Sequence, residues 1–315
     1  MRKPDGMPAH SCRREDEVFP LISPAAAYRN LLLFVLPALA VYLVFAVLPL
    51  ATSVVMSFFQ TSGGAGDVFV GFANYERLFT HPTISARFWN ALLNNMQYFA
   101  IHLIVEVPMG LLLAALLTSG KLARSEGIYR TLLFIPATLS VVIVGFVWRL
   151  IINPLWGLVG FPLLGTESTA LTTISLMSVW QYFGIPMVFL YSALLAVPNE
   201  LVEAANIDGA GSWTTFWKIK FPLIAPQFGL IAILTYIWTF NGFDLVFALN
   251  GSAPGPNYST DILGTYFYRT FFGSSGQLAD LDLGSAVATV IFLTVLLVTA
   301  AYFWLIQRRL KSYSV

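Results

Sequence analysis

Six long apolar segments, separated by polar connections, constrain this 315-residue chain more than any other feature of its sequence. A helix that crosses a hydrocarbon core of about 30 Å needs about 20 mostly apolar residues. The segments that meet this length are Leu31–Phe59, Ala91–Thr118, Thr131–Ile152, Leu171–Val197, Leu223–Leu249 and Ser285–Ile306. The sequence therefore predicts an all-α polytopic membrane protein with six transmembrane helices, the first of them long enough to tilt. The tripeptide Ala38-Leu39-Ala40 could mimic a signal-peptide cleavage site, but the apolar run continues well past it, which favours an uncleaved helix.

The composition excludes several other classes of protein. Only 10% of the residues are charged and 57% are hydrophobic, whereas soluble chains carry about 25% charged residues. A net charge of +1 provides no field that would attract nucleic acid. The single Cys12 excludes an internal disulfide, and the three histidines lie too far apart for metal-ligand spacing. Neither a cluster of catalytic groups nor a G-x-x-x-x-G-K-[ST] nucleotide loop occurs, so we expect no catalytic residue, metal site or cofactor in this chain.

The positions of the basic residues predict the orientation in the membrane. Thirteen of the 17 Lys and Arg residues lie in residues 1–30, in the 119–130 and 198–222 connections, and in the C-terminal tail. Only three lie in the alternate connections, and an excess of Lys and Arg marks the cytoplasmic side. We therefore expect both termini to be cytoplasmic. Residues 1–30 are polar and mixed in charge, which predicts a mobile tail before one membrane domain over residues 31–315.

The 198–222 connection changes from lipid-like to amphipathic and predicts two short helices joined at a glycine turn. The first helix can begin at Pro198, whose missing N–H costs nothing in a first turn. We expect it to stop at Gly209, since glycine supplies the backbone angles of a tight reversal. Ser212 can then cap a second helix, which Pro222 is expected to end. Three aromatic side chains are predicted on one side of it: Trp213, Phe216 and Trp217. This pattern fits an interfacial loop as well as a docking element for a cytoplasmic partner.

A longer series of residues decides between these interpretations. It consists of Glu203-Ala204-Ala205, then Asp208-Gly209-Ala210, then Phe216, Ile219 and Pro222. The series resembles the signature loop of ABC-importer permeases, in which the loop forms a coupling helix that sits in a groove of the cytoplasmic ATPase. The resemblance implies that Glu203 pairs with a basic residue of the ATPase, that Ala204 and Ala205 allow close approach, and that Gly209 sets the angle of the loop. Asp208 could cap the turn or reach the partner.

Further stretches narrow the resemblance. They are Phe69 to Phe79 with its Gly71-Phe72-Ala73-Asn74-Tyr75 core, Arg130 to Gly157, and Leu249-Asn250-Gly251 with the residues up to Leu263. Together they are similar to the first permease subunit of maltose-type and glycerol-phosphate-type carbohydrate importers. This implies a binding-protein-dependent importer of a sugar or related polyol, which works by alternating access in a bacterial or archaeal inner membrane. The implied partners are a second permease subunit, two ATPase subunits that use ATP and Mg²⁺, and an extracytoplasmic solute-binding protein.

The solute path should be lined by polar and aromatic side chains inside the spans, because such groups are costly when they face lipid. Sugars need both hydrogen bonds and aromatic surfaces. The predicted pathway residues are Tyr182, Gly184 and Met187 in the fourth span, and Thr235, Trp238, Thr239, Asn241 and Gly242 in the fifth. Gly242 stands where the maltose-type permease has an amide, which implies a roomier or differently bonded pocket. For Trp180 and Tyr182, helix packing or an aromatic interfacial belt is the alternative.

Glu106 is the most isolated acid in the chain, one helical turn after His102. A carboxyl group at mid-span is a functional candidate, although a hydrogen-bonded structural carboxylate is the simpler interpretation. A proton relay through Glu106 and Asp244 would instead suit a proton-coupled secondary transporter, which leaves the signature loop unexplained. The pocket spans contain no basic residue, which disfavours a phosphate-bearing solute.

Overall fold

The structure is a computed structural model that describes residues 24–62, 66–119 and 125–310. The chain divides into two units, Met1–Thr52 and Ser53–Val315. The described part of the first unit contains α1 (Pro24–Tyr42), a π turn, η1 (Leu43–Val47), and the start of α2 (Leu48–Met56), whose last four residues belong to the second unit. This helical run begins at Pro24 rather than at Leu31, and the rest of the expected N-terminal tail lies outside the described residues.

The described residues of the second unit form helices, their connections and one hairpin. Its first half contains β1 (Phe59–Ser62), β2 (Gly66–Phe69), α3 (Ala73–Thr80), α4 (Pro82–Ile101), η2 (His102–Glu106), α5 (Val107–Leu117), α6 (Glu126–Thr138), α7 (Val141–Ile151), α8 (Glu167–Tyr182) and α9 (Gly184–Leu195). Its second half contains α10 (Asn199–Ile207), α11 (Ser212–Thr215), η3 (Phe216–Lys220), α12 (Phe221–Phe240), α13 (Asp244–Asn250), η4 (Pro256–Tyr258), α14 (Leu263–Phe272) and α15 (Leu281–Leu310). The antiparallel hairpin pairs Phe59 with Phe69.

Four helices of the described chain are long and apolar enough to cross a membrane, and up to six spans result if each of two bent pairs counts as one. The predicted third span is the pair α6–α7, which bends by 92°, and the predicted fourth span is α8–α9, which bends by 45°. The prediction of six membrane-crossing segments is compatible with this arrangement, in which two of the six are bent pairs of helices. The α6–α7 break falls at Leu139, whose backbone is extended, three residues after Pro136.

Three prolines follow π turns rather than ending helices. Pro49, Pro108 and Pro222 each stand two residues after the last residue of a π turn. A proline ring in a regular helix clashes with the carbonyl group four residues earlier and leaves it without a donor. In the turn before Pro222, the N–H of Phe221 bonds to the oxygen of Phe216, five residues back. This wider turn relieves the clash, so the expectation that Pro222 ends the helix is wrong: the helix runs on from α11 into α12.

The connection between α13 and α15 holds a buried ion pair that the sequence analysis did not predict. Two guanidinium nitrogens of Arg269 in α14 bond to the two carboxylate oxygens of Asp261 at 3.1 and 2.5 Å. The side-chain amide of Asn94 in α4 donates to the carbonyl oxygens of Tyr258 and Asp261, both at 2.9 Å. These bonds fix a connection whose sequence is rich in Gly, Ser and Pro.

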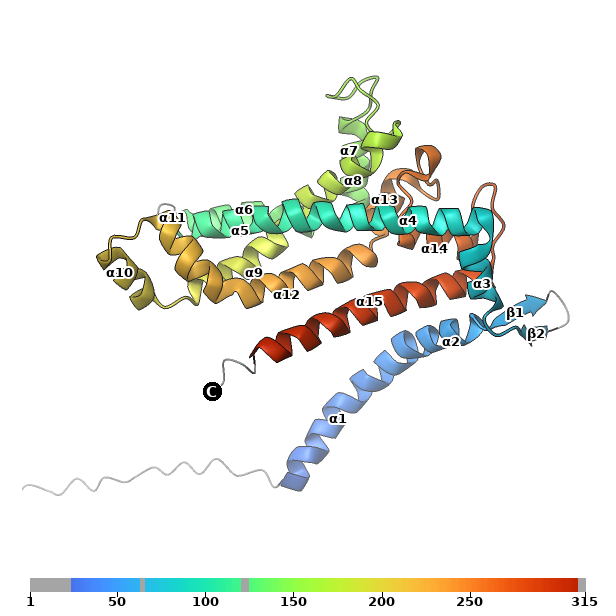
Figure 1. Cartoon of the computed structure of the whole chain (residues 1–315), viewed down its shortest axis with the longest axis horizontal. Helices are drawn as coiled ribbons and strands as arrows, with labels where there is room; N and C mark the ends of the chain where they lie inside the picture. Colours follow the sequence, from blue (N-terminus) through green and yellow to red (C-terminus); the bar gives the residue numbers. More distant parts are fainter. Residues whose placement is uncertain (1–23, 63–65, 120–124, 311–315) are drawn as a thin grey trace, which may run out of the picture. The chain divides into compact units, whose positions relative to one another are not determined.

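Helices α5, α9 and α12 share one cluster of buried apolar side chains. Figure 1 shows them toward the end of the second unit at which α10 and α11 lie. A Cβ atom at Gly110 of α5 would lie 2.9 Å from the backbone nitrogen of Met187, so glycine lets α5 and α9 approach closely. Gly184 has the same role toward α6, because a Cβ there would lie 2.8 Å from the carbonyl oxygen of Leu133. These close contacts hold α9 beside the π turn η2 and opposite α12.

Candidate functional site

The loop between α10 and α11 takes its shape from a glycine turn. Helix α10 begins after Pro198 and ends in two characteristic bonds: the N–H of Ala210 donates to Ala205 at 2.9 Å, and that of Gly209 to Asn206 at 3.1 Å. This is the Schellman arrangement, which requires a left-handed residue at Gly209, and its φ is +78°. A Cβ atom at Gly209 would meet nothing within 4 Å. The backbone angle, and not lack of space, therefore requires glycine here.

The second half of the loop continues directly into α12. Gly211, and not Ser212, occupies the N-cap position, so the expected serine cap is wrong. The expected aromatic side is present, because Trp217 contacts Trp213 and Phe216 with ring centroids 5.6 and 5.2 Å apart. Trp217 also contacts Phe221, at 5.0 Å. The aromatic rings therefore connect α11 to the first turn of α12.

The outer surface of the loop combines acids with large apolar side chains. Glu203, Ala204 and Asp208 are exposed. Ile207 is 87% exposed and Trp213 75% exposed. Of the other residues of the series, Ala205 is buried, Ala210, Phe216 and Ile219 are half-buried, and Pro222 is exposed. Exposed apolar groups beside charges are typical of an interaction surface.

The loop lies at one end of the second unit, next to the last turn of α5 (Figure 1). Leu116 of this turn and the next residues, Thr118 and Ser119, line one groove together with Trp213 and Phe216. The 119–130 and 198–222 connections therefore leave the helices at the same end, as the predicted orientation requires.

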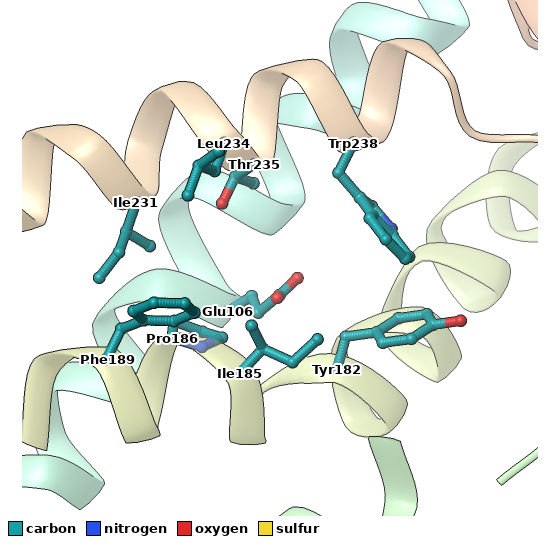
Figure 2. Close-up of a pocket in the computed structure, with 9 residues that line it drawn as sticks. All are labelled: Glu106, Tyr182, Ile185, Pro186, Phe189, Ile231, Leu234, Thr235 and Trp238. Carbon is teal, nitrogen blue, oxygen red and sulfur yellow. The ribbon is translucent and has the colours of Figure 1, made fainter. Parts of the chain in front are cut away.

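A cavity of about 90 Å³ lies between α9, α12 and the π turn η2 (Figure 2). Its apolar lining consists of Ile185, Pro186, Phe189, Ile231 and Leu234. Its polar and aromatic lining consists of Glu106, Tyr182, Thr235 and Trp238. The Tyr182 and Trp238 rings meet edge to face with centroids 5.1 Å apart. The cavity thus joins a carboxyl group, the hydroxyl group of Thr235 and an aromatic pair.

Three of the eight predicted pathway residues line this cavity: Tyr182, Thr235 and Trp238. The structure places the other five elsewhere. Gly184 contacts α6, Met187 is fully buried in the core between α5 and α9, and the Thr239 hydroxyl bonds back to the carbonyl oxygen of Thr235 at 2.9 Å.

Asn241 and Gly242 follow the end of α12. The Asn241 side-chain amide bonds back to the carbonyl oxygen of Ile237 at 2.8 Å. A Cβ at Gly242 would lie 2.9 Å from the oxygen of Thr239. Trp180 packs against Trp148, with centroids 5.5 Å apart, which matches the packing alternative considered for it. The apolar lining residues were not predicted, since an isoleucine or leucine in an apolar helix carries no signal of its own.

Behind the cavity wall, His102 forms a buried hydrogen-bond chain. The hydroxyl of Tyr98 donates to Ser178 at 2.8 Å, and the Ser178 oxygen lies 2.9 Å from His102 Nε2. His102 Nδ1 lies 2.8 Å from the carbonyl oxygen of Tyr98. This oxygen can only accept, so Nδ1 carries a proton, and in the neutral ring Nε2 accepts a hydrogen bond from the Ser178 hydroxyl. The nearest carboxylate oxygen of Glu106 lies 3.6 Å from Nε2.

The fold and these two features are those of a membrane transport subunit. Bent and straight apolar helices surround a mainly apolar cavity with a few polar groups, and the loop between α10 and α11 extends at one end. The family model described as "Binding-protein-dependent transport system inner membrane component" matches residues 106–312. The chain belongs to this family and is an ABC transporter permease, a multi-pass protein of the inner membrane.

Two relatives cover most of the chain. The probable ABC transporter permease protein YurN of Bacillus subtilis (strain 168) is 32% identical over 84% of this chain and 91% of its own length. The lactose transport system permease protein LacF of Rhizobium radiobacter is 32% identical over 86% of this chain and 91% of its own length. A solved bacterial ABC transporter for import of the acidic polysaccharide alginate has the same fold, with a TM-score of 0.73 at 23% identity, over 88% of this chain and 97% of that one.

Proposed function

We propose that this permease conducts a sugar or a related polyol in an ATP-driven importer, and that the solute passes through the cavity between α9 and α12. The observation that carries the proposal is the combination of the Tyr182–Trp238 pair with the Thr235 hydroxyl and the Glu106 carboxyl in one cavity. Aromatic faces pack on the apolar faces of sugars, and the polar groups bond their hydroxyls. The lactose permease LacF, at 32% identity, supports this substrate class.

The 198–222 loop would transmit force from a separate ATPase. Glu203 would pair with a basic group of that partner, Ala204 would allow close approach, and Asp208 and Gly209 would hold the angle between α10 and α11. Ile207 and Trp213 would supply the apolar contacts, since buried aromatic and aliphatic anchors dominate such interfaces. ATP and Mg²⁺ would be bound by the ATPase subunits alone.

The cavity is incomplete in this chain, which supports a second permease subunit. Trp238 is 52% exposed and Phe189 is 55% exposed, although both line the cavity. A second, unlike permease would cover this side, two ATPase subunits would bind at the cytoplasmic end, and an extracytoplasmic binding protein would deliver solute at the other. Both termini would be cytoplasmic. Closure of the ATPases would rock the two permeases between inward-open and outward-open states.

Uptake into proteoliposomes that contain the whole complex tests this function against proton-coupled transport. Radiolabelled sugars presented with the binding protein should enter only when ATP is present inside, and a protonophore should leave the rate unchanged. Uptake by the permease without ATP, abolished by the protonophore, would establish the secondary transporter and contradict the proposal. The same vesicles with a non-hydrolysable ATP analogue provide the control.

A further inference from the structure

We propose that the groove between α5 and the 198–222 loop binds an anionic phospholipid, with an acyl chain along α5 and the phosphate group at Lys220. This groove shares no lining residue with the solute cavity. Its volume is about 570 Å³, within the range of about 300–1,000 Å³ that is typical of ligand sites. The inference depends on the membrane location of the chain and not on the solute that it carries.

The first argument is how far the groove extends along a membrane helix. Pro108, Leu112 and Leu116 of α5 line it, and they lie in the stretch Pro82–Leu117, which is long and apolar enough to cross a membrane. From Pro108 to Leu116 this helix is about 12 Å long. Leu112 is 60% exposed and Leu116 49% exposed, so much of their apolar surface is left uncovered by the described chain. An acyl chain reaches a groove at this depth, whereas a water-soluble subunit reaches only its end.

The second argument is the charge of the groove. Among the described residues that line it, Lys220 alone is charged, and none is Asp or Glu. The Lys220 ammonium group forms no ion pair with any residue of the described part of the chain. Lys220 is half-buried, which is typical of a lysine whose alkyl stem packs on apolar surface while its ammonium group stays at the membrane boundary. The phosphate group of an anionic lipid would supply the missing counter-charge.

The third argument is the pair of tryptophans that lines the same groove as Lys220. The Trp213 and Trp217 rings contact each other with centroids 5.6 Å apart, and Trp217 is 42% exposed. Neither indole N–H donates a hydrogen bond to another described residue. Tryptophan at a membrane–water boundary places its ring among acyl chains and its N–H toward the headgroups. The groove therefore combines the apolar wall, the aromatic boundary and the cation that a phospholipid needs.

The test compares two photoactivatable lipids that share their acyl chains and differ in net charge: anionic phosphatidylglycerol and zwitterionic phosphatidylcholine. Each carries a diazirine in one acyl chain and is added in trace amount to nanodiscs of unlabelled phosphatidylcholine that contain the whole transport complex. After illumination, mass spectrometry measures the label on residues 108–116 as a fraction of the label on the whole chain. We expect this fraction to be about fivefold higher for phosphatidylglycerol, which is the preference that one lysine beside an anionic headgroup provides.

Three lysine variants assign the preference to this groove. K220Q should reduce it to less than about twofold, and K220R, which keeps the positive charge, should retain it. K218Q is the matched control and should also retain it, because Lys218 is an exposed lysine of the same turn that does not line the groove. None of these changes alters residues 108–116, so the labelled peptides that are compared are identical in every variant.

Three results would overturn the inference and leave the proposed function standing. One is equal labelling of residues 108–116 by the two lipids in the wild type, including no labelling by either. The second is a K220Q complex that unfolds at the wild-type temperature and keeps the preference, or a K218Q complex that loses it to the same extent. The third is labelling of the permease alone that disappears in the whole complex, which would show that a partner subunit fills the groove.

Discussion

The loop over residues 198–222 and the cavity between α9 and α12 are built in opposite ways. In the loop, the N–H groups of Gly209 and Ala210 bond to the carbonyl oxygens of Asn206 and Ala205, which are close neighbours in the sequence. In the cavity, Glu106 comes from η2, Tyr182 from the end of α8, and Trp238 from α12. Shape in the loop is therefore a local property that a short motif specifies, whereas the cavity exists only after three distant helices have packed. We expect loop variants to break coupling and cavity variants to change solute affinity.

The largest effect is expected for Gly209→Val. A β-branched residue at a φ of +78° costs more than the roughly 1–2 kcal/mol of an ordinary residue in this conformation. The turn should change its angle, so uptake should fall at least about tenfold while ATP hydrolysis continues. Uptake and hydrolysis are measured on the same proteoliposomes.

Gly211→Val is the matched control, because Gly211 lies in the same loop with open space around it but has a φ of −72° and a ψ of 161°. These are ordinary extended angles for valine, so this variant should transport normally. Equal loss of uptake in both valine variants would show that bulk, and not the backbone angle, is what the loop cannot tolerate.

Trp238→Ala should have the next largest effect. It removes the ring that meets Tyr182 and exposes the cavity wall. Losing an aromatic contact of about 1–1.5 kcal/mol should raise the solute concentration for half-maximal uptake about tenfold, with an unchanged ratio of solute to ATP. Trp180→Ala is the control, since Trp180 packs on Trp148 outside the cavity. A similar rise in both variants would contradict the assignment of the cavity.

Thr235→Val should have a smaller effect of the same kind. Valine keeps the shape of threonine but removes the hydroxyl group that lines the cavity. A hydrogen bond of about 1 kcal/mol corresponds to an increase of about fivefold in half-saturation. Thr239→Val should change this value less, because its hydroxyl bonds to the Thr235 carbonyl oxygen and not to the cavity. The reverse order would place the solute on the other side of α12.

Pro222→Ala should have the smallest effect. The π turn before it already accommodates the ring, and the helix continues through this position. We expect the free energy of unfolding to change by less than about 1 kcal/mol and transport to stay near the wild-type rate. A large loss in either quantity would indicate that Pro222 determines the path of the helix.

The sequence predicted the class of fold and the loop well, because both depend on local patterns. Long apolar runs specify membrane helices, and glycine at the end of α10 specifies the turn. The sequence did not predict the 92° bend between α6 and α7. A run of apolar residues has the same composition whether its helix is straight or broken. The assumption that proline ends a helix also missed Pro222, because a π turn is a backbone adjustment without a sequence signature of its own.

The residues that line the cavity were predicted only in part. Tyr182, Thr235 and Trp238 are conspicuous in apolar helices and do line the cavity. Helical spacing alone also grouped Thr239 and Gly242 with them. The Thr239 hydroxyl instead bonds back to the carbonyl oxygen of Thr235, and a Cβ at Gly242 would lie 2.9 Å from the oxygen of Thr239. The buried Asp261–Arg269 pair lay in a connection rich in turn-forming residues, and only the three-dimensional structure brings its two members to 2.5 Å.

The ratio of solute imported to ATP hydrolysed, measured at saturating solute in proteoliposomes that contain the whole complex, tests the division between loop and cavity most directly. The account predicts that this ratio collapses in Gly209→Val and stays at the wild-type value in Trp238→Ala. A wild-type ratio in Gly209→Val, together with a collapsed ratio in Trp238→Ala, would contradict it.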